Sequence, residues 1–258
     1  MSLPRSIPAV PKAPQPGAFL LPLLLFVLPL AATAGTETVT VRHVVDGDTV
    51  ILTDNRHVRL IGINAPEVGR DGQPDEPFAQ AARARLRELA EGKPATLLTE
   101  SEPRDRHGRT LAHLRTPLGS AEEILIKDGL VTAVAVPPNV RDAARLFELE
   151  RAARQSRRGL WAHAYSTARA AADLTPRDGG FRFVRGIVTR VGQSRKNVYL
   201  DLGPTVAVRI RHEDWRQYFR DKPDAWRGRS ISVRGWVSEY EGRLHIGVGH
   251  PLMIQTLP

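Results

Sequence analysis

Polar and apolar residues alternate along the first part of the chain that carries a regular pattern. Residues 38–44 alternate in this way, residues 49–52 continue the pattern, and residues 57–63 follow after the turn-forming pair Asp54-Asn55. A period of two places successive side chains on opposite faces of a strand. The pattern therefore predicts three strands that follow one another as a meander.

A change of period marks the next elements. Apolar residues recur at helical spacing over 77–91, and Gly92 then ends the predicted helix. Residues 95–99 and 110–115 return to the composition of strands. Five strands with interleaved helices predict a small Greek-key barrel of the oligonucleotide-binding type.

Two further helices are predicted from their end signals. Ser120 and Glu123 have the spacing of a capping box, which predicts a short helix that ends at Gly129. Asn139 is the expected N-cap of a longer helix that runs to about Arg158.

The C-terminal part repeats the strand pattern. A helix is predicted near residues 213–221, after the third of five strands. The predicted strands are 182–191, 197–202, 205–210, 230–237 and 244–248. We therefore expect a second barrel of the same type, and a chain that is mainly β with helices (α+β) overall.

The N-terminal segment has the pattern of a secretory signal. Arg5 and Lys12 precede an apolar run over residues 18–32, and Ala32-Thr33-Ala34 follows as a cleavage site. The run is shorter than the roughly 20 apolar residues that cross a bilayer. The segment predicts export to the periplasm or the medium of a bacterium, without a stable membrane anchor.

Charge is divided unevenly along the chain. Residues 35–175 hold 20 basic and 20 acidic side chains, whereas residues 176–258 hold 15 basic and 8 acidic ones, with nine of the fifteen aromatic residues. Residues 163–180 show little apolar periodicity, which indicates a linker. The predicted divisions are a signal peptide (1–34), a first barrel domain (35–162), the linker (163–180) and a basic barrel domain (181–258).

Composition narrows the functional classes. The chain of 258 residues has no cysteine, which excludes disulfides, thiolate zinc sites and cysteine nucleophiles. A formal charge of +9 favours an anionic partner such as nucleic acid or a membrane surface.

Three short polar segments carry the candidate chemistry. They are Asp46-Gly47-Asp48-Thr49, then Arg59 to Glu67 with the sequence RLIGINAPE, and Asp105 to Arg109 with the sequence DRHGR. Each has an ordinary structural explanation, because Asp-Gly pairs and charged loops are common in turns. Arg59 is the exception, since an arginine in an apolar strand needs an anionic partner.

Taken together, DGDTV, VRLIGINAPE and DRHGR resemble the staphylococcal nuclease (thermonuclease) family over residues 39–161. The resemblance implies a five-stranded barrel that uses calcium (Ca2+) to hydrolyse phosphodiesters in DNA and RNA. It implies that the catalytic residues are Arg59, Glu67 and Arg109. It also implies that the calcium ligands are Asp48, Asn64 and the backbone carbonyl of Ala65, with Asp46 beside the metal.

The implied residue types suit this reaction. Negative charge grows on the phosphoryl oxygens in the transition state, so fixed cations lower the barrier. A carboxylate such as Glu67 can take a proton from water, and oxygen ligands suit calcium. Asn64 departs from the family, which often has aspartate at this position, and one fewer charge predicts weaker calcium binding.

Two other functions are compatible with the same residues. One is a nucleic-acid-binding protein with a degenerate nuclease barrel, although the presence of Arg59, Glu67 and Arg109 together argues against it. The other is an interaction module of the cell envelope. In the C-terminal half, the arginines and aromatic residues favour contact with nucleic acid. The alternative there is that Trp226 and Trp236 belong to the core and the arginines are only solvated.

Overall fold

The computed structural model describes residues 35–69 and 72–258, so the predicted signal segment lies outside the described residues. No helix in the described part of the chain combines the length and apolar character needed to cross a membrane.

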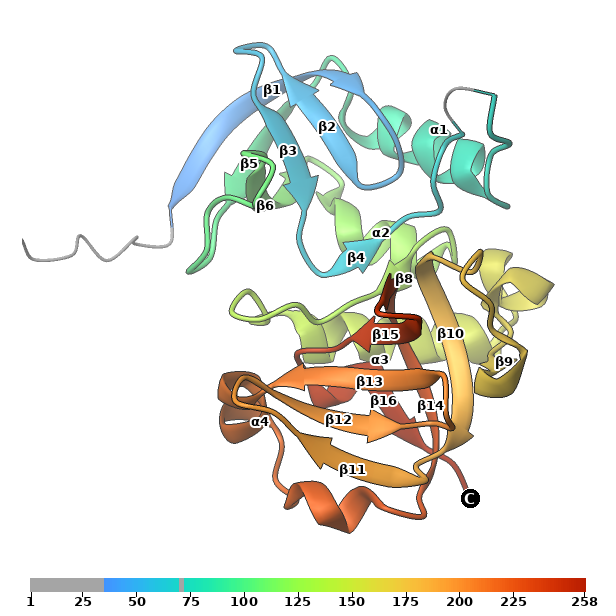
Figure 1. Cartoon of the computed structure of the whole chain (residues 1–258). Coiled ribbons are helices and arrows are strands. Elements are labelled where there is room, and N and C mark those ends of the chain that lie inside the picture. The colour runs from blue at the N-terminus through green and yellow to red at the C-terminus, as the bar shows by residue number, and fades with distance from the viewer. Residues whose placement is uncertain (1–34, 70–71) are drawn as a thin grey trace, which may run out of the picture. The chain divides into compact units, whose positions relative to one another are not determined.

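Five strands of the first half close into a barrel (Figure 1). They are β1 (Thr36–Val44), β2 (Thr49–Leu52), β3 (His57–Leu60), β5 (Pro94–Leu98) and β6 (Thr110–Thr116). The sheet order is β3-β2-β1-β5-β6, and a parallel pairing of β3 with β6 joins its two ends. The inward side chains of β3, Val58 and Leu60, are 0% and 1% exposed. The predicted five-stranded barrel is confirmed.

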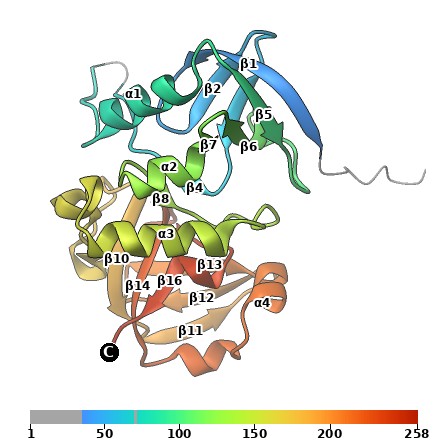
Figure 2. The ribbon, with the colours of Figure 1, turned by 180° about the vertical axis from the view of Figure 1, so that it is seen from behind.

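Helices and short strands complete this half. They are β4 (Ile63–Asn64), α1 (Ala79–Ala90), β7 (Gly119–Ser120), α2 (Ala121–Lys127), β8 (Thr132–Ala133) and α3 (Ala143–Gln155). Figure 2 shows α2 and α3 side by side, in agreement with their contacts. Leu86 and Leu89 anchor α1 in the core, where they are 0% and 1% exposed.

One predicted helix cap is confirmed and one is wrong. The Ser120 hydroxyl accepts a hydrogen bond from the Glu123 backbone N–H at 3.3 Å, as a capping residue does. Asn139 does not cap α3, which begins at Ala143. Its side chain accepts from the Glu102 N–H at 2.9 Å and donates to the Glu102 carbonyl at 2.7 Å. The Asn139 side chain thus binds the distant Glu102 backbone and does not cap the helix that the local pattern predicted.

The C-terminal strands form a second sheet. They are β9 (Arg169–Ala170), β10 (Gly180–Ile187), β11 (Arg190–Gln193), β12 (Asn197–Asp201), β13 (Val206–Arg211), β14 (Ser230–Tyr240), β15 (Arg243–Gly247) and β16 (Ile254–Thr256). The order is β11-β12-β13-β15-β14-β10-β9, with β13 and β15 parallel. The helix α4 (His212–Tyr218) follows β13, as the sequence predicts for its third strand.

The first strand predicted for this half is divided in two. The Val188 N–H donates to the Arg229 carbonyl just before β14, whereas the Thr189 N–H donates to the Asp201 carbonyl at the end of β12. The chain therefore passes from one end of the sheet to the other between these two residues. Among the described residues, β10 and β11 are connected by the chain but are not paired strands, so the expected second barrel stays a prediction, and we use the name second barrel for the strands β10–β15.

The two halves are tied by polar contacts. Arg234 on β14 donates to the buried Glu150 carboxylate of α3 at 2.7 Å and to the Ala133 carbonyl at 3.1 Å. The segment predicted as a linker contains two short 3-10 helices, at Ala164–Ser166 and Ala171–Asp173, and the strand β9, which pairs with β10.

Candidate active site

Two buried carboxylates lie in the turn between β1 and β2. Asp46 is 8% exposed and Asp48 is 6% exposed. The Asp48 N–H donates to the Asp46 Oδ1 at 3.0 Å, and the Asp48 Oδ2 accepts from the Ala65 N–H at 2.6 Å. These bonds connect the turn to the segment that follows β4.

Gly47, between the two aspartates, is needed because there is no room for a side chain. A Cβ built on Gly47 would lie 2.6 Å from the Ala82 Cβ of α1 and 2.7 Å from the Ala65 Cβ. The sequence suggested a glycine that permits a tight turn. The structure shows a glycine that lets α1 approach the carboxylate turn.

Arg59 stands on β3 in the position that the sequence marked as unusual. Its side chain is 13% exposed, and its Nη2 lies 3.0 Å from the Asp48 Oδ2. Its Nη1 donates to the carbonyls of Leu60 at 2.6 Å and Ile63 at 3.0 Å. The required anionic partner is therefore Asp48, and the guanidinium is held in one orientation.

Asn64 joins the same group. Its Oδ1 accepts from the Arg59 Nη2 at 3.3 Å, and its Nδ2 donates to the Ala65 carbonyl at 3.3 Å. Both ends of the amide thus contact residues that the resemblance assigned to the site. Asn64 is fixed by the pairing of β4 with β8, where it lies opposite Thr132.

Burial is the main influence on the protonation of the Asp48 carboxyl group. It raises the pKa of Asp48 to about 7 against the opposing effect of Arg59, and the negative charges of Asp46 and Glu67 raise it as well. Arg59 opposes this rise without cancelling it, and a bound cation would act on the Asp48 pKa in the same direction as Arg59.

The oxygen donors present fit a calcium ion. Two carboxylates, one amide oxygen and one backbone carbonyl are hard ligands of the kind that calcium prefers. The residues that would hold it are Asp46, Asp48, Asn64 and Ala65. Among the described residues, no group of three or more histidine, cysteine or acidic side chains is placed so as to hold a metal ion.

Glu67 is exposed and lies in the loop that follows β4. Its backbone N–H donates to the Glu76 Oε2 at 2.9 Å, and the Glu76 N–H donates back to the Glu67 carbonyl at 2.9 Å. These two bonds close the loop and fix the backbone that carries the candidate general base.

Glu76 is held in turn by two residues that the sequence analysis did not single out. The Tyr165 hydroxyl donates to the Glu76 Oε2 at 2.8 Å, and the Arg182 Nη1 on β10 lies 3.5 Å from the Glu76 Oε1. Burial raises the pKa of Tyr165, and the Glu76 carboxylate raises it further. No local pattern could reveal this link, because Glu76 and Tyr165 are 89 residues apart.

Arg109 precedes β6 and is held by its own loop. Its Nε donates to the Asp105 Oδ2 at 2.7 Å, and its side chain is 35% exposed. In the parallel pairing, Arg59 lies opposite Leu111, two residues after Arg109. Arg109 therefore lies just before the strand that pairs with β3, which carries Arg59.

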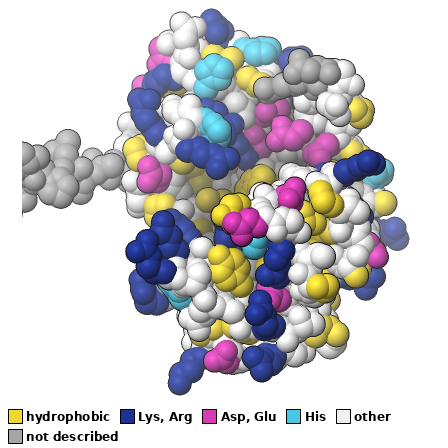
Figure 3. Space-filling view, viewed as in Figure 1, with side chains coloured by type: hydrophobic (Ala, Val, Ile, Leu, Met, Phe, Trp, Pro, Cys, Tyr) yellow, Lys and Arg dark blue, Asp and Glu magenta, His cyan; other side chains and the backbone are white. Residues whose placement is uncertain are grey.

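The surface view agrees with a charged site. Figure 3 shows acidic side chains gathered in the upper half of the visible face. The structure thus joins Asp46, Asp48, Arg59, Asn64 and Ala65 by direct contacts. Arg109 instead contacts Asp105 in its own loop.

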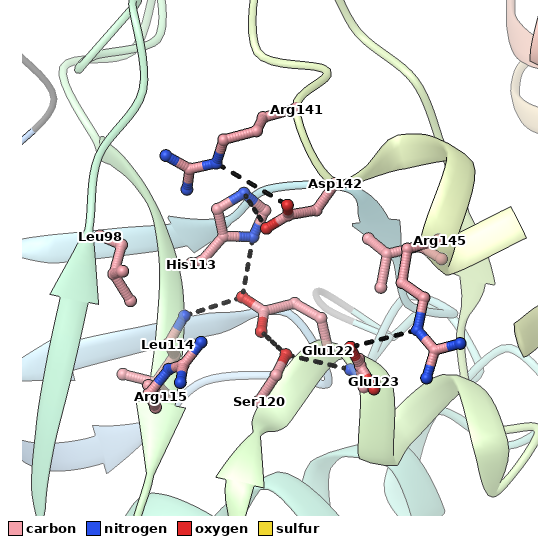
Figure 4. A pocket seen from close by; sticks show the side chains of 11 residues that line it. Leu98, His113, Leu114, Arg115, Ser120, Glu122, Glu123, Arg141, Asp142 and Arg145 are labelled. Atoms are coloured by element: carbon pink, nitrogen blue, oxygen red, sulfur yellow. Dashed lines mark hydrogen bonds and ion pairs between the residues drawn. The ribbon is translucent and has the colours of Figure 1, made fainter.

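A separate cavity of about 300 Å³ opens beside β6 (Figure 4). It is lined by His113, whose Nε2 lies 2.7 Å from the Glu100 Oε1, and by Glu122 and Asp142. None of the candidate catalytic or calcium-binding residues lines it.

Comparisons with known proteins identify relatives of the first half of the chain. A family model described as "Staphylococcal nuclease homologue" matches residues 57–163, a range that begins after the Asp46–Asp48 turn. A thermonuclease of Staphylococcus intermedius is 30% identical over 128 residues, which are 48% of this chain and 76% of that protein. A thermonuclease of Staphylococcus hyicus is 27% identical over 135 residues, which are 51% and 80%. A micrococcal nuclease of Shigella flexneri is 35% identical over 131 residues, which are 46% and 70%.

Proposed function

The chain belongs to the staphylococcal nuclease family, and we propose that it is a calcium-dependent nuclease that hydrolyses phosphodiester bonds of DNA and RNA. The observation that carries this proposal is the buried Arg59 guanidinium, fixed 3.0 Å from Asp48 beside four oxygen donors that suit calcium. A bound calcium ion would supply positive charge to the phosphoryl oxygens.

Each candidate catalytic residue has a definite role in the proposed mechanism. Arg59 holds its positive charge in place through contacts made before substrate arrives, which avoids reorganisation during the reaction. Arg109 uses its Nε for Asp105, and in the proposed mechanism its terminal nitrogens bind the phosphate. A planar guanidinium can pair with two phosphate oxygens at once.

Glu67 would act as the general base. Its exposed carboxylate accepts a proton from the attacking water, a role typically worth about 10² to 10⁴ in rate. The two hydrogen bonds between Glu67 and Glu76 hold the loop that presents this carboxylate.

Hydrolysis assays on DNA and RNA, with calcium and with a chelator, test the proposal. We expect both substrates to be cut only with calcium, and Glu67→Gln to lower turnover by about 10² or more while the protein stays folded. Near-parental turnover of Glu67→Gln would remove the mechanism and favour the binding protein with a degenerate barrel.

We also propose that the protein is exported. The proposal rests on residues 1–34, whose sequence has the order of a secretory signal. Mass spectrometry of the protein from the periplasm or the medium should find Gly35 as its first residue. Recovery of the uncut chain from the cytoplasm alone would contradict export.

A further inference from the structure

The outward side of the second barrel has an unusual composition. Along β12 and β13, Val198, Leu200, Val208 and Ile210 point inward and are at most 1% exposed. The alternate positions, Tyr199 and Arg209, therefore point outward. Figure 1 shows β11, β12 and β13 side by side. We call the outward side of these three strands, β15 and β14 the outer face.

Strand register aligns a row of residues across the outer face. Each member lies opposite the next in the pairings of β11 with β12, β12 with β13, β13 with β15 and β15 with β14. The row consists of Gly192, Tyr199, Arg209, Gly247 and Trp236. Since neighbouring strands are about 4.8 Å apart, Tyr199 and Trp236 are separated by roughly 14 Å.

The two glycines leave open space in this row. A Cβ at Gly192 would meet only the Tyr199 Cβ, at 4.0 Å, and a Cβ at Gly247 would meet only the Trp236 carbonyl oxygen, at 4.0 Å. Neither glycine has a positive φ, so the backbone does not require glycine. The row therefore offers shallow gaps next to Tyr199 and Trp236.

The charge of the outer face is positive. Within the described part of the chain, no carboxylate lies at ion-pair distance from Arg209. Asp201 is shared by two arginines, with its Oδ2 2.7 Å from the Arg190 Nε and its Oδ1 3.1 Å from the Arg243 Nη2. In Figure 3, Lys and Arg side chains are spread over the lower half of the visible face. An anionic ligand fits this balance.

His245 gives an independent indication of a ligand. It lies on β15, is 7% exposed, and its ring centroid is 5.8 Å from that of Tyr199. Its Nδ1 has no hydrogen-bond partner among the described residues, and neither has the Nε of Arg243. Buried polar atoms without a partner are destabilising, and a bound ligand could pair with them.

We propose that the outer face binds single-stranded nucleic acid along this row. Bases stack on Tyr199 and Trp236, and phosphates lie against Arg209 and Arg243. Aromatic rings accept any base in this way, and a basic groove follows the backbone. A duplex hides the faces of its bases, so the rings favour an open strand.

The far end of the row leads toward the candidate active site. The Trp236 ring lies 5.1 Å from that of Phe181, and the next residue, Arg182, contacts Glu76, which binds the Glu67 backbone. We therefore infer that the outer face guides a strand to the site. This second step rests on the proposed nuclease function, whereas binding does not.

Fluorescence anisotropy with a labelled oligothymidylate and a duplex of equal length tests the binding. The chain carries Glu67→Gln and the buffer contains a chelator, so cleavage does not interfere. Tyr199→Ala should weaken binding of the single strand by about tenfold, and Tyr199→Phe should keep it because the ring remains. Arg209→Ala should also reduce the logarithmic salt slope by about 0.7.

Arg216→Ala is the matched control, since Arg216 is exposed on α4, away from the row. It should bind like the parent. Parental affinity of both Tyr199→Ala and Arg209→Ala, or equal loss in Arg216→Ala, would overturn the proposal. Equal binding of duplex and single strand with no effect of Tyr199→Ala would show phosphate contact alone. Intact binding, together with no cleavage by the unsubstituted chain in a separate assay with calcium, would refute the nuclease function but not this face.

Discussion

When the divided strand β10–β11 is counted once, both barrels have an outward arginine on their third strand, and the two arginines have opposite surroundings. Arg59 on β3 is 13% exposed and lies 3.0 Å from the buried Asp48. Arg209 on β13 is exposed, and no carboxylate of the described residues lies within ion-pair distance. The arginine of the first barrel is thus held by a carboxylate, whereas that of the second barrel has no carboxylate of the described residues beside it.

The neighbouring strand explains the difference. Across β2, Arg59 faces Thr49, which directly follows Asp48 in the carboxylate turn. Across β12, Arg209 faces Tyr199. Carboxylates beside an arginine allow a metal and proton transfer, whereas an aromatic ring beside an arginine provides a platform for bases. The comparison shows that two or three residues on adjacent strands, and not the strand order, make the surroundings of the two arginines different.

The largest expected effect comes from the same substitution in both barrels. Arg59→Met should lower turnover by about 10² or more, because a fixed cation in the transition state is lost. Arg209→Met should leave kcat unchanged and raise KM for single-stranded substrate. Steady-state kinetics of both variants measure this, and Arg59→Lys separates charge from the planar shape.

Circular dichroism must show that Arg59→Met folds, since Asp48 loses its partner. Its carboxylate, with a pKa already raised to about 7, can then take a proton. Equal losses of kcat in the two variants would mean that the barrels do not divide the work.

A smaller effect is expected from the link between the barrels. Tyr165→Phe and Arg182→Met each remove one contact with Glu76, so the loop that carries Glu67 is held less firmly. We expect kcat to fall about tenfold with KM unchanged, because a loose general base loses orientation. The pH profile of kcat should shift as well, which a merely structural role would not cause.

Arg185→Met is a suitable control for this pair, since Arg185 is an exposed arginine on the same strand, β10. If Arg182→Met and Arg185→Met have the same kinetics, then Glu76 does not position Glu67 through the second barrel.

Sequence patterns predicted the barrel and the central site because both depend on local signals. Alternation gave the strands, and an arginine in an apolar strand marked Arg59 as paired. Asp48 becomes the partner of Arg59 through the pairing of β3 with β2, and the spacing of the two residues in the sequence does not predict this contact. Close to the site, the reason for Gly47 was invisible, because it depends on Ala82 of a helix far along the chain.

The contacts of the second half depend on register between strands. The row of Tyr199, Arg209 and Trp236 exists only once β12, β13, β15 and β14 are paired. The composition predicted a basic domain that is rich in aromatic residues, but it could not show which of these residues are buried and which are exposed. Trp226 is 7% exposed and belongs to the core, whereas Trp236 is 39% exposed.

Asn64→Asp should have a moderate effect that is confined to the first barrel. The new carboxylate adds charge among oxygen donors, and an ionised aspartate cannot donate to the Ala65 carbonyl as Asn64 does at 3.3 Å. Half-maximal activity should then need several-fold less calcium, with activity at saturating calcium nearly unchanged. Calcium titrations at fixed pH and ionic strength measure this.

The opposite result has its own physical reason. A further carboxylate beside Asp48 would raise the pKa of Asp48 further and so hinder the metal. An unchanged or higher calcium requirement in Asn64→Asp would exclude Asn64 as a ligand and leave Asp46 and Asp48 to define the site. Oligonucleotide binding by the outer face should not respond in either case.

The smallest expected effect concerns stability and uses the buried histidine on the fifth strand of each barrel. Burial alone would lower the pKa of His113 on β6, but the carboxylates of Glu100 and Glu122 raise it from 6.5 to about 9. Burial lowers the pKa of His245 on β15, and the nearby Arg209 and Arg243 lower it further. The two barrels therefore respond to pH in opposite directions.

The protonated form of His113 is favoured by folding, so its contribution is complete below about pH 6.5 and is lost as the pH rises through about 9. The neutral form of His245 is favoured, so its contribution is present above pH 6.5 and is lost as the pH falls. Urea unfolding at pH 6, 7.5 and 9 should show a loss of stability toward high pH that His113→Gln removes and His245→Gln leaves in place. A loss that persists in His113→Gln would place its origin outside the first barrel's histidine and its carboxylates.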